Sequence, residues 1–176
     1  MATEPWRNPH PAPNLDEVRY RVPPQSIVLA LLRAWWPALV WSSLIFLAST
    51  DALSSDNTSR VIVPALQWLI PSLSPDTVEF VHHLIRKAAH FVEYFIFFLL
   101  VYRGVRAGRK GFHWSWGLIA WAIAALYSLS DEFHQIFVVS RGPSLWDSLI
   151  DSTGALVALL ILFALYRYVR GERSAL

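Results

Sequence analysis

Apolar residues gather in four long runs, and shorter polar segments separate these runs. The runs occupy about residues 27–48, 88–102, 112–130 and 149–169. A helix crosses the hydrocarbon core of a bilayer with about 20 mainly apolar residues. The first run reaches this length when Ile27 to Leu32 are included, with Arg33 snorkelling to the headgroups. The pattern therefore predicts an all-α membrane protein with four transmembrane helices.

The connection between the first two runs, residues 49–86, has a mixed pattern. Residues 57–70 carry apolar side chains at helical spacing, but this stretch is too short and too polar to span a bilayer. Pro71 and Pro75 interrupt the chain, and a helical pattern resumes over residues 76–86. We expect one or two interfacial helices here, lying on the membrane surface in the first outer loop.

Both ends of the chain are predicted to be tails. Residues 1–24 hold six prolines and no apolar period, which indicates a flexible cytoplasmic tail. This region is long for the start of a signal peptide, and no small-x-small cleavage site follows the apolar run, so we expect an uncleaved first helix. The membrane domain then covers residues 25–170, and residues 171–176 form a short cytoplasmic tail.

The composition agrees with this class of protein. Hydrophobic residues make up 55% of the 176 residues and charged residues 16%, whereas soluble domains hold about 25% charged residues. Nine Trp, six Tyr and ten Phe suit a chain that meets lipid interfaces. A net charge of +2 is too small to indicate a nucleic-acid partner. The absence of cysteine excludes disulfides, thiolate nucleophiles and Cys-ligated metals.

The basic residues predict the orientation of the four helices. Eleven of the fifteen Lys and Arg lie before or near the start of the first run, between the second and third runs, or near or after the end of the fourth. Because cytoplasmic segments of membrane proteins carry an excess of Lys and Arg, we expect both termini in the cytoplasm. The other two connections then face the extracytoplasmic side.

Polar residues gather at the ends of the runs that this orientation places outside. Because charge at a membrane boundary is costly unless it is paired, solvated or functional, these residues are candidates for a single site. They are Lys87, His90, Glu93 and Tyr94 at the start of the second run, Asp131, Glu132, His134 and Gln135 at the end of the third, and Arg141, Asp147 and Asp151 around the start of the fourth.

The start of the second helix presents one polar face. At about 100° per residue, Lys87, His90 and Tyr94 fall within an arc of about 60°. Glu93 lies beside His90, about 60° further round the helix. Lys87 gives this face a positive charge, which could pair with an acidic residue on a neighbouring helix.

The fourth helix carries the matching acids. Asp147, Asp151 and Gly154 share one stripe of that helix. Gly154 also forms a small-xxx-small pair with Ala158, which lets a neighbouring helix approach closely. Opposite charges on facing helices relieve the cost of burial. We therefore predict that Asp147 or Asp151 lies close to the basic residues of the second helix, Lys87 or His90.

The charges in these clusters do not balance. Five carboxylates face two firm cations and two histidines, so some acids are protonated, the histidines are charged, or a cation binds. Perturbed groups of this kind are commoner at functional sites. The alternative is a polar network that only holds four helices together. For Arg141 the alternatives are contact with lipid phosphate and a bidentate grip on a ligand's carboxylate or phosphate.

Familiar catalytic patterns fit poorly. The chain has no HEXXH string, and none of its serines stands out as a nucleophile. A metal site of two histidines and a carboxylate could form from His90 and His134, but we expect neither a metal nor another cofactor. General acid–base chemistry needs only a histidine and a carboxylate. The catalytic candidates on this reading are His90, Glu132, His134 and Asp147.

Several polar residues recur at fixed spacings: Lys87-x-x-His90-Phe91-x-x-Tyr94, Glu132-x-x-Gln135, Arg141 and Asp147-x-x-x-Asp151-x-x-Gly154. This pattern resembles the VanZ-like family of small bacterial membrane proteins over about residues 45–165. That family takes its name from a protein linked to resistance to the glycopeptide teicoplanin. The resemblance implies a bacterial cell-envelope setting and a multi-helix membrane fold.

These observations lead to a functional hypothesis. We expect a multi-pass protein of the bacterial cytoplasmic membrane that binds a lipid-linked or peptidoglycan-related component at an extracytoplasmic polar site. The alternative is a membrane-embedded hydrolase or transferase that uses His–carboxylate acid–base chemistry on a lipid-linked substrate. Transport is a third reading, although one-sided polarity offers no path through a single copy. The expected ligand-binding residues are Lys87, His90, Tyr94, Glu132, Gln135, Arg141, Asp147 and Asp151.

Overall fold

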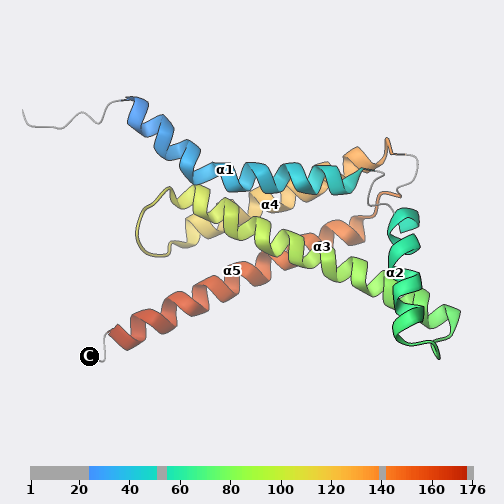
Figure 1. Cartoon of the computed structure of the whole chain (residues 1–176). Coiled ribbons are helices and arrows are strands. Elements are labelled where there is room, and N and C mark those ends of the chain that lie inside the picture. Colours follow the sequence, from blue (N-terminus) through green and yellow to red (C-terminus); the bar gives the residue numbers. More distant parts are fainter. Residues whose placement is uncertain (1–23, 51–54, 139–141, 174–176) are drawn as a thin grey trace, which may run out of the picture.

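The computed structural model describes residues 24–50, 55–138 and 142–173 of the chain. All regular structure in these residues is helical, which confirms the predicted all-α class (Figure 1). The helices are α1 (Pro24–Ser49), α2 (Ser55–Leu69), α3 (Pro75–Arg106), α4 (Trp114–Gln135) and α5 (Leu145–Arg173).

Helix α3 organises the bundle, because it contacts each of the other four helices. Its start is marked by Ser74, whose hydroxyl accepts a hydrogen bond from the Thr77 backbone N–H at 3.2 Å, and by Pro75 in the first turn. It ends at Arg106, and the next residue, Ala107, adopts a left-handed conformation with φ of 48°. At about 1.5 Å per residue its 32 residues extend about 48 Å, well beyond a hydrocarbon core of roughly 30 Å.

The length of α3 corrects one expectation from the sequence. Residues 76–86 were predicted as a separate interfacial helix, but they form the first three turns of α3. The prolines do interrupt the chain between α2 and α3. After Pro75, however, no breaker separates Arg86 from the apolar run, and Lys87, Ala88 and Ala89 all favour helix. The helix therefore continues without a break.

Helix α2 is the short helix expected over residues 57–70, and it lies across the first turns of α3 (Figure 1). Thr58 fixes the contact, since its hydroxyl lies 3.3 Å from His82 Nε2 and accepts a hydrogen bond from Arg86 Nη1 at 3.0 Å. His82 is buried there. These polar contacts attach α2 to the end of the bundle where α1 finishes and α3 begins.

The long helices α1, α3, α4 and α5 run alternately up and down, so they form an antiparallel bundle (Figure 1). The start of α1, the α3–α4 connection and the end of α5 lie at one end. Its core combines aromatic side chains of α3, such as Tyr94 and Phe98, with small residues such as Ala124 and Ala155 on the facing helices. Small residues allow close helix approach, while the aromatic rings fill the space that remains.

Aromatic polar groups also connect the helices. Trp41 Nε1 donates to the Glu93 carbonyl at 3.0 Å, which joins α1 to α3. Tyr127 donates to the Ser42 carbonyl at 2.7 Å, and Trp121 donates to the Ser152 carbonyl at 3.1 Å. Buried Tyr and Trp side chains normally find such partners. These bonds fix how each helix is rotated relative to its neighbours.

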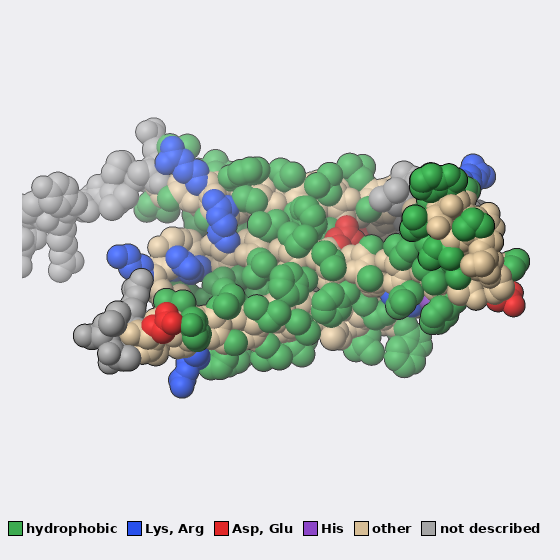
Figure 2. Space-filling model, turned by 60° about the horizontal axis from the view of Figure 1, so that its bottom comes forward, with side chains coloured by type: hydrophobic (Ala, Val, Ile, Leu, Met, Phe, Trp, Pro, Cys, Tyr) green, Lys and Arg blue, Asp and Glu red, His purple; other side chains and the backbone are tan. Residues whose placement is uncertain are grey.

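The outer surface of the bundle is apolar. Large hydrophobic side chains are exposed along α1, α4 and α5, and Figure 2 shows them covering most of one face, with Lys and Arg gathered mainly at one end. Among the described residues, two helices are long and apolar enough to cross a membrane, Ile27–Ser49 and Leu145–Glu172. Soluble monomers rarely expose contiguous apolar surface of this extent, so the surface favours a lipid environment.

Candidate functional site

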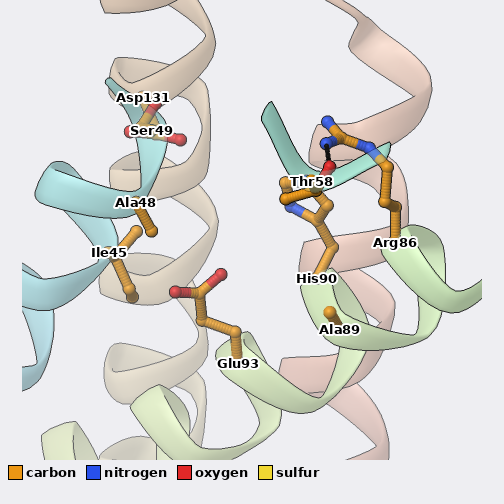
Figure 3. A pocket seen from close by; sticks show the side chains of 9 residues that line it. All are labelled: Ile45, Ala48, Ser49, Thr58, Arg86, Ala89, His90, Glu93 and Asp131. Carbon is orange, nitrogen blue, oxygen red and sulfur yellow. Dashed lines mark hydrogen bonds between the residues drawn. The ribbon is translucent and has the colours of Figure 1, made fainter. Parts of the chain in front are cut away.

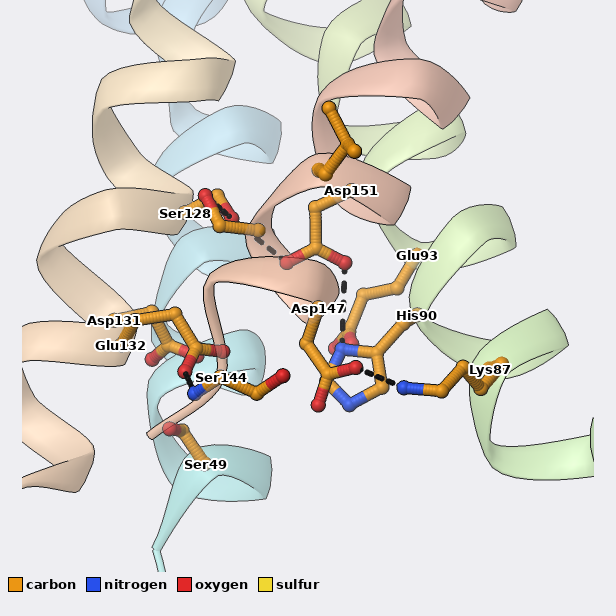
Figure 4. Close-up of polar contacts among 12 residues, drawn as sticks. Ser49, Lys87, His90, Glu93, Ser128, Asp131, Glu132, Ser144, Asp147 and Asp151 are labelled. Carbon is orange, nitrogen blue, oxygen red and sulfur yellow. Dashed lines mark hydrogen bonds and ion pairs between the residues drawn. The ribbon is translucent and has the colours of Figure 1, made fainter. Parts of the chain in front are cut away.

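Buried polar side chains meet at the end of the bundle where α1 finishes and α3 and α5 begin (Figure 4). We call this set the polar cluster. It consists of Ser49, Lys87, His90, Ser128, Asp131, Glu132, Gln135, Asp147, Ser148 and Asp151. It contains six of the eight residues predicted to bind a ligand. Of the other two, Tyr94 lies one turn deeper on α3 and Arg141 lies outside the described residues.

Lys87 of α3 forms an ion pair with Asp147 of α5. The two side chains are 28% and 25% exposed, so the pair sits at the rim of the cluster rather than in its interior. Asp147 lies in the first turn of α5, where the helix dipole also favours a negative charge. The predicted proximity of a basic residue of the second helix to an acid of the fourth is confirmed here.

His90 and Asp151 form the second contact between α3 and α5. His90 Nδ1 lies 3.3 Å from Asp151 Oδ1, and Asp151 is almost completely buried, with 1% of its side chain exposed. The other carboxylate oxygen accepts a hydrogen bond from Ser128 of α4 at 2.7 Å. Ser128 Oγ also lies 3.0 Å from Ser148 Oγ. Three helices therefore hold the Asp151 carboxylate in place and set the position of the His90 ring.

A glycine makes this contact possible. A Cβ atom at Gly154 would overlap the backbone carbonyl oxygen of Phe91 and lie 3.1 Å from its carbon. The backbones of α3 and α5 therefore approach too closely at this level for a side chain at residue 154 to fit between them. His90 precedes Phe91, and Asp151 lies one turn before Gly154, so the close approach brings the two ionisable side chains together.

Glu132 joins the end of α4 to the start of α5. Its Oε2 accepts a hydrogen bond from the Ser144 backbone N–H at 2.6 Å, just before the first turn of α5. Burial raises the pKa of Glu132, and the nearby carboxylates raise it further, whereas the Ser144 N–H opposes this change. The N-terminus of α5, beside which this carboxylate lies, is a favourable place for a negative charge.

Gln135 joins α4 to the end of α1. Its amide donates to Ser49 Oγ at 3.0 Å and to Asp131 Oδ2 at 3.2 Å. All three side chains are buried. Since Asp131 and Gln135 are four residues apart on α4, their contact follows from helical geometry, whereas the bond to Ser49 depends on where α1 ends.

Several buried polar atoms of the site lack a well-formed hydrogen bond within the described residues. They are His90 Nδ1, Asp151 Oδ1 and the hydroxyl of Tyr94. His90 Nδ1 and Asp151 Oδ1 lie close to each other, but their geometry falls outside that of a hydrogen bond. Buried polar groups in proteins are usually satisfied, and those that are not often mark sites of function.

Two candidate residues lie apart from the cluster. His134 is half-buried, and its ring packs against that of Phe46 of α1 in a tilted arrangement, with the centroids 4.8 Å apart. It therefore packs at the side of the bundle and does not meet His90 or Asp151. Arg141 lies outside the described residues. In the described part of the chain, no group of three His, Asp or Glu side chains is arranged to hold a metal ion.

A cavity of about 120 Å³ lies next to the polar cluster, between α1, α2, α3 and α4 (Figure 3). Its polar lining comes from Ser49, Thr58, Arg86, His90, Glu93 and Asp131. Three of these residues also belong to the polar cluster. The cavity therefore gives the cluster a place at which a small polar group could be held.

Sequence reasoning did not select several of these residues. Ser128 sits within an apolar run, and only its position on the face of α4 that also carries Asp131 and Gln135 could have indicated it. Thr58 and Arg86 reach the site because α2 docks on α3, which no local pattern predicts.

No curated protein and no solved structure matches the chain. A family model described as VanZ/LLP1 matches residues 34–166, which is most of the chain and includes α3, α4 and every residue of the polar cluster. The chain therefore belongs to the VanZ/LLP1 family.

Proposed function

We propose that the chain is a multi-pass protein of the bacterial cytoplasmic membrane whose polar cluster binds a component of the cell envelope on the extracytoplasmic side. One observation carries this proposal: carboxylates, a histidine and hydroxyls are buried together at one end of a helix bundle with an apolar exterior. Such groups are costly to bury in a membrane protein and commonly serve function there.

The membrane assignment rests on the bundle as a whole. Four long antiparallel helices, α1, α3, α4 and α5, would each cross the bilayer, with α2 on the outer surface. The basic residues of the α3–α4 connection and of the end of α5 lie at the end opposite the polar cluster. This distribution supports a cytoplasmic location for that end.

The charges of the cluster indicate what kind of ligand it would take. Lys87 is engaged by Asp147, so the carboxylates of the interior outnumber the cations that face them among the described residues. A ligand with hydrogen-bond donors, such as hydroxyl, amide or ammonium groups, complements such a surface. Lipid-linked and peptide-bearing envelope components carry these groups.

The proposal is tested by identifying what copurifies with the protein. Wild type, Asp151→Asn and Asp76→Asn are purified in a mild detergent and analysed by untargeted lipid and metabolite mass spectrometry. Asp76 is an exposed acid on α3 and serves as the control. A component present with wild type and Asp76→Asn but depleted with Asp151→Asn supports the proposal. Identical sets of bound molecules, with all three proteins folded, would contradict it.

Catalysis is a second candidate, and the contact between His90 and Asp151 favours it. A carboxylate that fixes one ring nitrogen leaves the other available as a general base. On this reading the ring takes a proton from an attacking water or alcohol and returns it to the departing oxygen of a lipid-linked substrate. His134 gives a matched control, because its ring lies against Phe46. Turnover of an envelope lipid lost with His90→Ala but retained with His134→Ala would establish catalysis.

A cellular phenotype can be scored in parallel. The family is named for a protein linked to teicoplanin resistance, so susceptibility to that glycopeptide is the first property to measure after deletion of the gene. Complementation with Asp151→Asn and Asp76→Asn then connects the phenotype to the polar cluster.

A further inference from the structure

The cavity beside the polar cluster has charges of opposite sign on opposite sides (Figure 3). Arg86 lies on one side with Thr58, to which it donates a hydrogen bond at 3.0 Å. Glu93 and Asp131 lie on the side towards α1 and α4. A ligand that fits this lining carries an anionic group and a cationic group a few bonds apart.

We propose that this cavity binds the zwitterionic headgroup of a phospholipid with a primary amine, a phosphoethanolamine headgroup. The phosphate faces Arg86 and Thr58, and the ammonium group faces Glu93 and Asp131. This inference rests on the proposed function, because it names the chemical class of one envelope component that the site holds.

The basic side of the cavity suits a phosphate. The guanidinium of Arg86 presents several N–H donors in a planar fork, and such forks recognise phosphate through paired hydrogen bonds. The contact with Thr58 orients this fork. Since α2 supplies Thr58 and α3 supplies Arg86, the docking of α2 on α3 builds this side of the cavity.

The acidic side suits a primary ammonium group. Such a group has three N–H donors and no acceptor, so it complements carboxylate oxygens directly. A quaternary ammonium has no N–H to donate, and a glycerol headgroup brings no positive charge to two carboxylates. Glu93 and Asp131 therefore select for the primary amine among common phospholipid headgroups.

The size and the rim of the cavity favour a lipid over a free solute. Its volume of about 120 Å³ is small beside pockets of roughly 300–1,000 Å³ that enclose whole drug-sized ligands, so it takes only a small polar part of a larger molecule. Ala89 lines the cavity and is exposed, so the cavity opens beside α3. Ile85 and Val92, one turn to either side, are 40% and 52% exposed and offer apolar surface to acyl chains.

The test compares lipids that differ only in the amine. The purified full-length protein is mixed in detergent with equal amounts of phosphatidylethanolamine, its N-methyl and N,N-dimethyl forms and phosphatidylcholine, all with the same acyl chains. Bound lipid is counted by native mass spectrometry. Wild type is expected to retain phosphatidylethanolamine about tenfold over phosphatidylcholine, as the loss of a charged hydrogen bond implies, with a graded fall as N–H donors are removed.

Variants connect this preference to the cavity. Glu93→Gln should bring the ratio of bound phosphatidylethanolamine to bound phosphatidylcholine close to one. Glu79→Gln, at an exposed position on the same helix, should keep the wild-type ratio. Free phosphoethanolamine should compete poorly, which separates a lipid site from a phosphate site. The comparison of the four lipids uses only the wild-type protein. It therefore tests the preference for a primary amine even if Glu93→Gln does not fold.

Two results would overturn the inference. They are equal retention of all four lipids by wild type, and an unchanged preference in folded Glu93→Gln. Strong competition by free phosphoethanolamine would also overturn the lipid assignment. None of these results contradicts the proposed function, which is tested separately by measuring the molecules that Asp151→Asn fails to retain.

Discussion

The backbone carbonyl of Phe91 on α3 occupies the position where a side chain at residue 154 of α5 would begin. This contact sets the distance between the two helices that carry the polar cluster. Because His90 and Asp151 lie within one turn of it, the arrangement of the ionisable pair depends on a residue without any chemistry of its own.

Replacing this glycine should separate the helices. Gly154→Ala places a Cβ against the Phe91 carbonyl, and neither backbone can give way without moving its helix. We expect a loss of about 1–3 kcal/mol in the free energy of unfolding, the range found for overpacked interiors. Reversible unfolding in detergent measures it. Gly171→Ala on the same helix is the control, since nothing lies within 4 Å of the added Cβ, and it should leave stability unchanged or slightly higher.

The ion pair of Lys87 and Asp147 should show coupling between α3 and α5. Lys87→Glu places two like charges together and should lower the melting temperature. The double variant Lys87→Glu with Asp147→Lys exchanges the two charges and should recover part of the lost melting temperature. The coupling from the double-mutant cycle is expected at roughly 0.5–1 kcal/mol, since the pair is partly solvated. Recovery remains incomplete because a lysine in the first turn of α5 opposes the helix dipole. Additive single effects would argue against the pair.

Glu132 should make stability depend on pH. Because burial raises its pKa in the folded state, folding favours the neutral carboxyl. The stabilising contribution is complete below the pKa of the unfolded chain and is lost as pH rises through the folded-state pKa. Glu132→Gln keeps an acceptor for the Ser144 N–H and removes the titration.

The variant should therefore be more stable than wild type at neutral and alkaline pH, with the difference shrinking towards low pH. Melting curves from about pH 4 to about pH 9 measure this. Glu79→Gln, at an exposed position, should follow wild type throughout. A constant difference at every pH would mean that Glu132 acts by packing alone.

The predicted orientation can be tested with single cysteines, because the chain has none of its own. Gly142→Cys lies in the α4–α5 connection, where nothing lies within 4 Å of an added Cβ, and Lys110→Cys lies exposed in the α3–α4 connection. An impermeant thiol reagent on intact cells should label position 142 and leave position 110 unlabelled until the membrane is permeabilised. Labelling of position 110 alone would reverse the orientation.

The positions of apolar and polar residues along the chain determined where the long helices lie and which side chains share a helix face. The four apolar runs correspond to parts of four long helices, and the spacing of Lys87 and His90, and of Asp147 and Asp151, fixed which residues share a helix face. The small residue at 154 also indicated where another helix could approach. These features are local, because the helical period alone sets them.

The tertiary structure decided which faces meet. His90 lies at the start of one apolar run and His134 just after the end of another, yet His90 meets Asp151 whereas His134 meets Phe46. The difference comes from the rotation of each helix about its own axis, and bonds between distant residues, such as Trp121 to Ser152, fix that rotation. Ser128 joins the cluster for the same reason.

The cavity likewise depends on contacts that no local pattern contains. The sequence determined that Arg86 is a basic residue before an apolar run, but the docking of α2 brings Thr58 to it and closes one side of the cavity. Helical periodicity assigns each side chain to a face, whereas the packing of helices far apart in sequence assigns each face its neighbour. In this protein the sequence therefore determined which side chains share a helix face, and the packing of the bundle determined which faces contact each other.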